Sequence, residues 1–93
     1  MRVVQTGSFS RTIKKLHQTD KTAVDRAIRK IMANTGIGAM KKGALSGVRV
    51  HKFKVADKQY LPVYRHEKQP ERIVLLALGS HENFYRDLSK SQR

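Results

Sequence analysis

The chain has 93 residues, and 20 lysines and arginines against seven acidic residues give it a formal net charge of +13. This length suits one domain, residues 1–93, with a modest core that cannot enclose a deep substrate cavity. Cysteine is absent, which excludes disulfides and zinc sites built from thiolates. So one-sided a charge predicts a polyanionic partner: nucleic acid, an acidic protein or anionic lipid.

No segment has the pattern of a signal peptide or a membrane span. The N-terminal segment becomes polar too early for a signal peptide. The longest apolar run, Ile73 to Leu78, is too short to cross a bilayer. We therefore expect a soluble, cytoplasmic protein that does not contact a membrane.

The chain begins with the pattern of a strand followed by a short amphipathic helix. Residues 2–5 suit the strand, and Ser8 or Ser10 is placed to cap the helix. Three apolar residues at helical spacing form the buried side of this helix: Phe9, Ile13 and Leu16.

A second helix has the clearest apolar stripe in the sequence. Thr19 and Asp20 supply its N-terminal cap, and Gly36 is a suitable residue to end it. The stripe consists of Val24, Ala27, Ile28, Ile31 and Met32. The glycine-rich segment that follows, residues 35–47, is predicted to be a loop.

The C-terminal half predicts three strands and a closing helix. The strands cover residues 48–55, 59–66 and 72–78, joined by tight turns at 56–58 and 67–71. The last strand is apolar throughout, so we expect it to be central and covered on both faces. Pro62 cannot donate a ladder hydrogen bond, which predicts a bulge or an irregular edge beside it.

Ser80 can cap a final helix over residues 81–88, and residues 89–93 form a frayed tail. The predicted order is thus β-α-α-β-β-β-α. This order indicates an α+β fold in which helices pack against one sheet.

Lys52 and Lys54 are the most unusual pair in the sequence, because alternation along a strand places both ammonium groups on one face. Phe53 and Val55 then face the helices, and the lysines face outward from the open side of the sheet. If Tyr60 and Tyr64 belong to the core, Arg65 joins the lysines, and two further residues follow the last strand. The complete predicted patch is Lys52, Lys54, Arg65, His81 and Tyr85.

This set of residues suits cleavage of RNA by its own 2′-hydroxyl without a metal or cofactor. Such cleavage needs an acid and a base, for which His81 is a candidate, and cations around the phosphorane. Tyr85 can stack on a base. Four more cations are expected to steer or bind RNA: Lys41, Lys42, Arg49 and Lys58.

Simpler interpretations remain open for the same residues. Two exposed lysines are commonly just solvated, and His81 can be an ordinary helix N-terminal residue. His51 and His66 fall on apolar parities and are interpreted as partly buried structural histidines. None of the histidines has metal-ligand spacing, and the glycines from Gly36 to Gly43 form no phosphate-binding motif.

The ordered combination of several segments resembles the RelE/ParE superfamily of bacterial toxins, over nearly the whole chain. These segments are Gly47 to Val55 with its lysine pair, Tyr60-Leu-Pro-Val-Tyr64-Arg65, and Leu78-Gly-Ser-His-Glu-Asn-Phe-Tyr-Arg-Asp-Leu88. The resemblance implies a fold like that of microbial ribonucleases, with a helical hairpin on a small twisted antiparallel sheet. It also implies the toxin half of a type II toxin–antitoxin pair.

RelE-like members cut mRNA in the ribosomal A site without metal, so the resemblance implies that Lys52 and Lys54 flank the scissile phosphate. Two departures affect the catalytic set. Leu61 stands where that branch typically has arginine, which Arg65 would have to replace. Gly79-Ser-His81 stands where the branch often has Gly-Lys-Arg, so His81 would be a functional exchange.

Two alternatives remain at this point. A ParE-like toxin would poison DNA gyrase and cut nothing, although ParE-like chains usually lack the lysine pair and have a longer helical hairpin. A non-catalytic basic RNA-binding protein is the other. For a toxin we expect an acidic antitoxin that wraps the hairpin or a sheet edge, a hetero-oligomer with it, a monomer when free, and mRNA on the ribosome as substrate.

Overall fold

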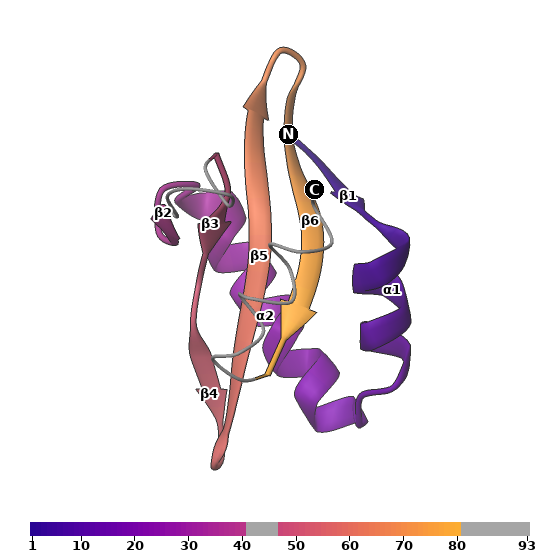
Figure 1. Ribbon diagram of the computed structural model, residues 1–93. Helices are drawn as coiled ribbons and strands as arrows, with labels where there is room; N and C mark the ends of the chain where they lie inside the picture. Colours follow the sequence, from indigo (N-terminus) through magenta and orange to yellow (C-terminus); the bar gives the residue numbers. More distant parts are fainter. Residues whose placement is uncertain (41–46, 81–93) are drawn as a thin grey trace.

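The structure, a computed structural model, describes residues 1–40 and 47–80 and consists of two helices and six strands over these residues (Figure 1). In chain order these are β1 (Arg2–Gln5), α1 (Gly7–Lys14), α2 (Gln18–Ala33), β2 (Ala39–Met40), β3 (Arg49–Val50), β4 (Phe53–Val55), β5 (Lys58–Lys68) and β6 (Glu71–Gly79). The predicted helix over 81–88 and the tail 89–93 lie outside the described residues. Within these residues no helix is long and apolar enough to cross a membrane.

All six strands belong to one sheet, which is mixed rather than antiparallel. The strand order is β1-β6-β5-β3-β2, and β4 pairs with β5 beyond the end of β3. β1 runs parallel to β6, with Arg2 opposite Arg72, whereas the other pairs are antiparallel. The expectation of an antiparallel sheet was therefore wrong for β1, because the first strand of the chain pairs with β6, the last described strand, and runs in the same direction. The expected loop over 35–47 also contains β2.

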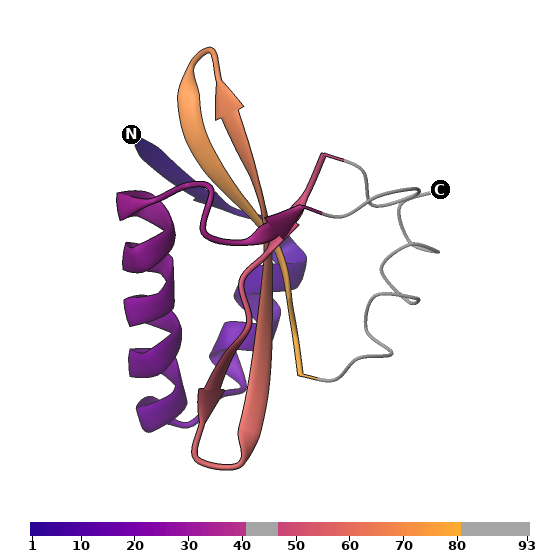
Figure 2. The ribbon, with the colours of Figure 1, turned by 90° about the vertical axis from the view of Figure 1, so that its left-hand side faces the viewer.

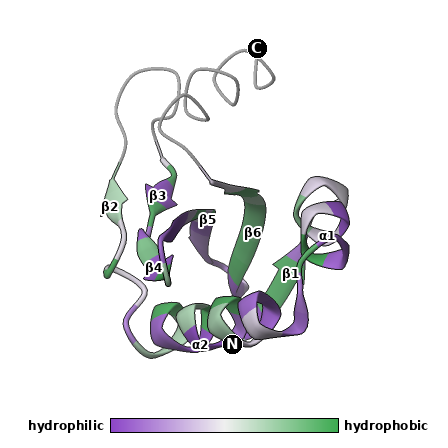
Figure 3. Ribbon diagram, turned by 90° about the horizontal axis from the view of Figure 1, so that it is seen from below, coloured by the Kyte–Doolittle hydropathy of each residue, from purple (hydrophilic) through white to green (hydrophobic). Residues whose placement is uncertain are grey.

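Both helices cover the same face of this sheet, with α2 lying along it and α1 beside β1 and β6 (Figures 1 and 2). Seen from below, β6 is strongly apolar, as expected for a strand inside the fold (Figure 3). The core between the layers contains Phe9, Val24, Ile31, Tyr60, Tyr64, Ile73, Leu75 and Leu78. Met32, predicted on the apolar stripe of α2, is instead 37% exposed, because it follows Ile31 at the margin of the buried face.

The opposite face of the sheet is not open, contrary to the sequence-based expectation. It carries a second buried cluster: Val48, Val50, Leu61 and Val63, with Leu76 packed against them. Leu61 and Val63 are fully buried. β5 is thus apolar on both of its faces along its middle, and so is β6, which confirms the prediction of a central, doubly covered strand.

Pro62 explains why the predicted strand 48–55 is two strands. Val50 pairs with Val63 and Phe53 with Tyr60, so one register runs through both segments and sets His51 opposite Pro62. The His51 amide donates to the Pro62 carbonyl at 3.1 Å, but proline has no N–H to return a bond. The ladder is therefore interrupted at His51 and Lys52.

The predicted irregularity beside Pro62 is confirmed by a register shift between β5 and β6, the strand on the opposite side from β3 and β4. Val63 pairs with Ala77 and Tyr64 with Leu75, which leaves Leu76 as the extra residue of a bulge in β6. Thr6 uses this bulge: its hydroxyl donates to the Leu76 carbonyl at 2.6 Å and accepts the Phe9 amide at 3.2 Å. Thr6 is thus the cap of α1, not Ser8 or Ser10, and it fixes the helix to the sheet.

The second helix begins before the predicted caps Thr19 and Asp20, which lie in its first turn, and it has no side-chain cap. Its N-cap residue is His17, and it ends at Ala33 with Asn34 as C-cap, before Gly36. Asp20 is buried and accepts a hydrogen bond from the Tyr60 hydroxyl at 2.5 Å. The Lys58 ammonium lies 3.4 Å from the same carboxylate oxygen. This cluster joins α2 to the start of β5.

The hydrogen bond from Tyr60 lowers the pKa of Asp20, and the Lys58 charge acts in the same direction while burial opposes both. The same hydrogen bond raises the pKa of Tyr60 to about 12, so the phenol stays protonated at neutral pH. A carboxylate whose pKa falls on folding adds stability above its unfolded value of 3.8. That stability is lost as pH falls through the folded pKa.

We expect Tyr60→Phe to lower the free energy of unfolding by about 2 kcal/mol at pH 7, because it removes a hydrogen bond to a buried charge. The loss should shrink as pH falls below the ordinary carboxyl range, where Asp20 takes up a proton. Urea unfolding at pH 7 and at acidic pH measures this. An equal loss at both pH values would mean that Tyr60 contributes packing alone.

Candidate functional site

The lysine pair lies where β3 gives way to β4. Both Lys52 and Lys54 are exposed, whereas Phe53 and Val55 pack against the helical core, which confirms the predicted alternation. Phe53 is held by stacking on Tyr60, with ring centroids 5.7 Å apart. The lysines are therefore displayed by a strand whose other side is anchored in the core.

Lys54 also borders a hollow between β4 and α2, which we call the α2–β4 groove. Its lining residues are Ala23, Arg26, Ala27 and Lys30 from α2 and His51, Phe53 and Lys54 from the sheet. A neighbouring hollow shares Ala23, Arg26 and Lys54 and extends the groove past Gln18, Thr19, Thr22 and Val55. Among the described residues, no carboxylate lines either hollow. The floor is formed largely by small or apolar side chains, and the charged groups at its rim are all cations.

His51 is the one titratable group of this groove that ionises near neutrality. It is partly buried, and its ring stacks on that of Phe53 with centroids 6.4 Å apart. Burial lowers the pKa of His51, and the charge of Lys30 lowers it further. At neutral pH the ring is thus uncharged and can either accept or donate a hydrogen bond.

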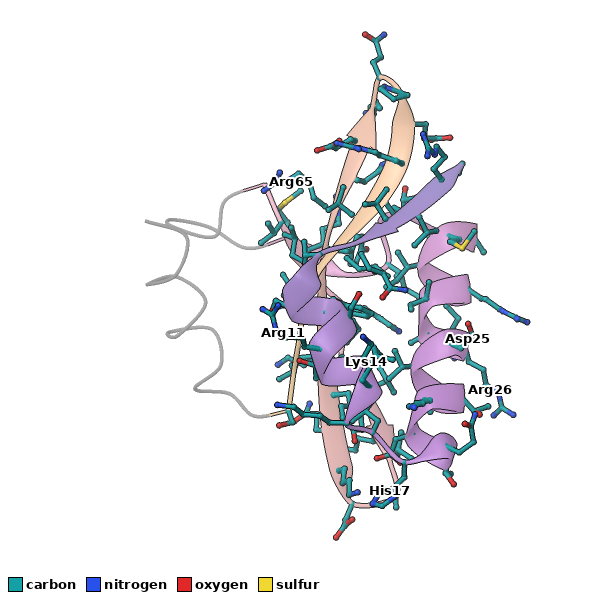
Figure 4. All side chains as sticks on the ribbon, turned by 90° about the vertical axis from the view of Figure 1, so that its right-hand side faces the viewer. Arg11, Lys14, His17, Asp25, Arg26 and Arg65 are labelled. Atoms are coloured by element: carbon teal, nitrogen blue, oxygen red, sulfur yellow. The ribbon has the colours of Figure 1, made fainter. Side chains whose placement is uncertain are left out.

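The structure does not bring Arg65 to the lysine pair. Lys54 is opposite Gln59, and Arg65 lies six residues further along β5, a separation of about 20 Å at the usual rise of a strand. Arg65 Nη1 is 3.8 Å from Glu67 Oε2, and Glu67 also pairs with Arg72. Figure 4 shows Arg65 on the side of the sheet opposite α2 and Arg26. The role predicted for Arg65 stays a prediction.

Two of the cations expected to bind RNA, Arg49 and Lys58, have partners within the protein, and their RNA-binding role stays a prediction. The Arg49 guanidinium donates a hydrogen bond to the Gly38 carbonyl at 2.9 Å. The Tyr64 hydroxyl holds the same segment, since it accepts the Gly38 amide at 3.0 Å and donates to the Thr35 carbonyl at 2.7 Å. Lys58 is paired with Asp20. Lys41, Lys42, His81 and Tyr85 lie outside the described residues, so their predicted roles stay predictions.

Leu61, placed by the resemblance at a position where RelE-like chains typically have arginine, is fully buried with Val48, Val50 and Val63 and belongs to the second core. Within residues 1–40 and 47–80, no three metal-ligating side chains gather into one group. The cations that do gather near Lys54 are those of the α2–β4 groove.

Sequence reasoning missed Arg26, Lys30 and His51 as neighbours of Lys54. Arg26 and Lys30 are four residues apart on α2, beside Ala23 and Ala27, so their common face was readable from helical spacing. What the sequence did not reveal is that β4 lies along that flank of the helix. His51 was interpreted as structural because strand alternation places it on the same face as the apolar residues Phe53 and Val55.

Comparisons with known proteins were made for the sequence and for the fold. A family model described as the ParE-like toxin of type II bacterial toxin–antitoxin systems matches residues 3–89. A search of curated protein sequences found no significant match.

Several solved structures share the fold. The toxin chain of the Mycobacterium tuberculosis RelBE2 toxin–antitoxin complex superposes with a TM-score of 0.74 at 20% identity, over 86% of this chain and 96% of that one. A chain of the intact Escherichia coli RelBE complex gives 0.70 at 16% identity, over 87% and 96%. A YoeB/ParE toxin from Agrobacterium tumefaciens gives 0.70 at 21% identity, over 88% and 100%.

At these identities the superpositions establish the fold alone. The family model covers nearly the whole chain and carries the assignment further. The chain therefore belongs to the ParE-like toxins of type II toxin–antitoxin systems, within the RelE/ParE superfamily.

Proposed function

We propose that this toxin is a metal-independent endoribonuclease that cuts mRNA on the ribosome. The observation that carries the proposal is the exposed pair Lys52 and Lys54, displayed side by side on a strand anchored by Phe53 and bordered by further cations without a carboxylate. Like charges placed so close are relieved by an anion, and the phosphate of RNA is an anion that suits them. The RelE-like fold and the charge of +13 support the same reading.

In the proposed reaction the 2′-oxygen attacks the adjacent phosphorus and the bond from phosphorus to the 5′-oxygen breaks. A base takes the proton of the 2′-hydroxyl, and an acid gives a proton to the leaving 5′-oxygen. Lys52 and Lys54 stabilise the charge on the non-bridging oxygens as it grows, with Arg65 as a more distant phosphate ligand. His81 is proposed as acid or base and Tyr85 as the stacking residue.

A gyrase-directed toxin that cuts nothing is the second candidate. The description of the matching family model as ParE-like favours it. The position of Arg65, away from the lysine pair, favours it too, because it removes one of the cations expected at the scissile phosphate. In that case Lys52 and Lys54 would contact a protein target.

We further propose an acidic antitoxin as the partner that silences this chain in a hetero-oligomer. Two of the structurally similar chains were crystallised in toxin–antitoxin complexes. The net charge of +13 would be partly neutralised by such a partner. The cytoplasm, where ribosomes and gyrase both work, is the expected location.

Primer extension on an mRNA translated in a purified system tests the proposed activity. We expect new 5′ ends at codon boundaries that require ribosomes, and we expect them to disappear with His81→Ala. A supercoiling assay with gyrase is run in parallel on the same preparations. Intact mRNA together with blocked supercoiling would overturn the proposal and assign the protein to the gyrase inhibitors.

The double variant Lys52→Ala/Lys54→Ala should slow the cleavage of translated mRNA by at least about 100-fold, since it removes the cations nearest the transition-state charge. Growth arrest after induced expression should be lost with it. The matched control is Lys14→Ala/Lys68→Ala, which removes the same charge from exposed positions on α1 and at the end of β5. Full toxicity of the Lys52/Lys54 variant at equal expression would show that the pair does not act in catalysis.

A further inference from the structure

We infer that the α2–β4 groove is a second binding site for the phosphodiester backbone of single-stranded RNA, with Arg26, Lys30 and Lys54 as its phosphate ligands and His51 as a hydrogen-bonding group beside them. This inference rests on the proposed function, because it assumes that RNA is the polyanion this toxin meets. It assigns roles to three residues, Arg26, Lys30 and His51, that have none in the proposed cleavage.

The geometry provides the first argument. Arg26 and Lys30 lie four residues apart on α2, and both line the hollow that His51 and Lys54 border from the sheet. The extension past Gln18 and Thr22 continues the groove along α2. From Gln18 to Lys30 the helix advances by about 18 Å, enough for more than one phosphate to lie along it.

Charge provides the second argument. Three cationic side chains line one hollow with no carboxylate among the lining residues, so they repel one another when the groove is empty. The nearest acidic residues of α2 are directed elsewhere: Asp25 pairs with Arg29, and Asp20 is buried against Tyr60. A bound anion would remove this repulsion.

The lining chemistry favours a nucleic acid over an acidic protein. Arginine and lysine at the rim are the usual phosphate ligands, and arginine binds phosphate with two parallel hydrogen bonds. The extension adds the hydroxyl of Thr19 and the side-chain amide of Gln18, which are common donors to phosphate. The stacked rings of His51 and Phe53 form one wall, against which a base can lie.

Lys54 links the groove to the lysine pair, because it belongs to both. An RNA strand whose scissile phosphate lies at Lys52 and Lys54 would then continue into the groove on one side. The groove would hold the flanking nucleotides and increase affinity without taking part in bond breaking. Variants of Arg26 and Lys30 should thus weaken binding and leave the chemical step unchanged.

His51 supplies a local readout of occupancy that needs no cleavage. The charged groups facing it are Arg26 and Lys30 from α2 and Lys54 from β4, all of them cations. A phosphate bound among them should favour the protonated ring and raise the pKa of His51 by about 1. The probe is a short 2′-O-methyl oligouridylate, which has no free 2′-hydroxyl and so cannot be cleaved by the proposed reaction.

The experiment follows the His51 ring protons by NMR across pH, in the full chain, with and without this oligonucleotide; His51→Gln identifies the resonance. Salt-dependent affinity is measured in parallel by fluorescence anisotropy. The test variant is Arg26→Gln/Lys30→Gln, and the control, Lys14→Gln/Lys68→Gln, removes the same charge outside the groove. We expect the rise in the pKa of His51 to vanish only in the test variant. In that variant the slope of log affinity against log salt concentration should fall in magnitude by about 1.4, which is about 0.7 for each lost phosphate contact.

Three results would overturn the inference. The first is an unchanged His51 titration with the oligonucleotide bound, and the second is an equal loss of affinity in the test and control variants. The third is an acidic peptide such as polyglutamate that raises the pKa of His51 as strongly as the oligonucleotide at equal charge, which would make the groove a protein-docking surface. Binding at the groove without cleavage of translated mRNA would instead count against the proposed nuclease activity and leave this site standing.

Discussion

The buried carboxylate of Asp20 joins the helical layer of this toxin to its sheet. Its bond to the Tyr60 hydroxyl, together with Lys58, fixes the N-terminal part of α2 over the start of β5. β4 pairs with the same part of β5, so the distance between α2 and β4 depends on this contact. The α2–β4 groove, and the position of Arg26 and Lys30 relative to Lys54, are consequences of it.

Two irregularities in the sheet determine the positions of Lys52 and of the start of α1. Pro62 interrupts the ladder opposite His51, so Lys52 is presented at the break between two short strands rather than inside one long strand. The bulge at Leu76 exposes a carbonyl that Thr6 uses to hold the start of α1. The same bulge changes the parity of β6, so that Leu75 and Leu78 both reach the helical core.

Much of this architecture could be predicted from the sequence, because helical spacing and strand alternation are local signals. The stripe of α2, the alternation of Phe53 with the lysines and the irregularity at Pro62 were all predictable in this way. The parallel pairing of β1, the bond from Thr6 to Leu76 and the use of Asp20 were not, since each depends on residues far apart in the chain. The separation of Arg65 from Lys54 was not predictable for a related reason: shared parity places residues on one face but says nothing of their distance along it.

The fold of this toxin resembles RelE and its sequence matches the ParE-like family model, so its surface residues decide its chemistry. The central claim is that the 2′-hydroxyl of the RNA attacks the adjacent phosphorus and cleaves the strand. The most direct measurement is the chemical form of the 3′ ends of mRNA fragments made during translation with the purified toxin, determined by mass spectrometry. The account predicts 2′,3′-cyclic phosphates, or the 3′-phosphates formed when these hydrolyse. Fragments ending in 3′-hydroxyls, or mRNA that stays intact, would contradict it.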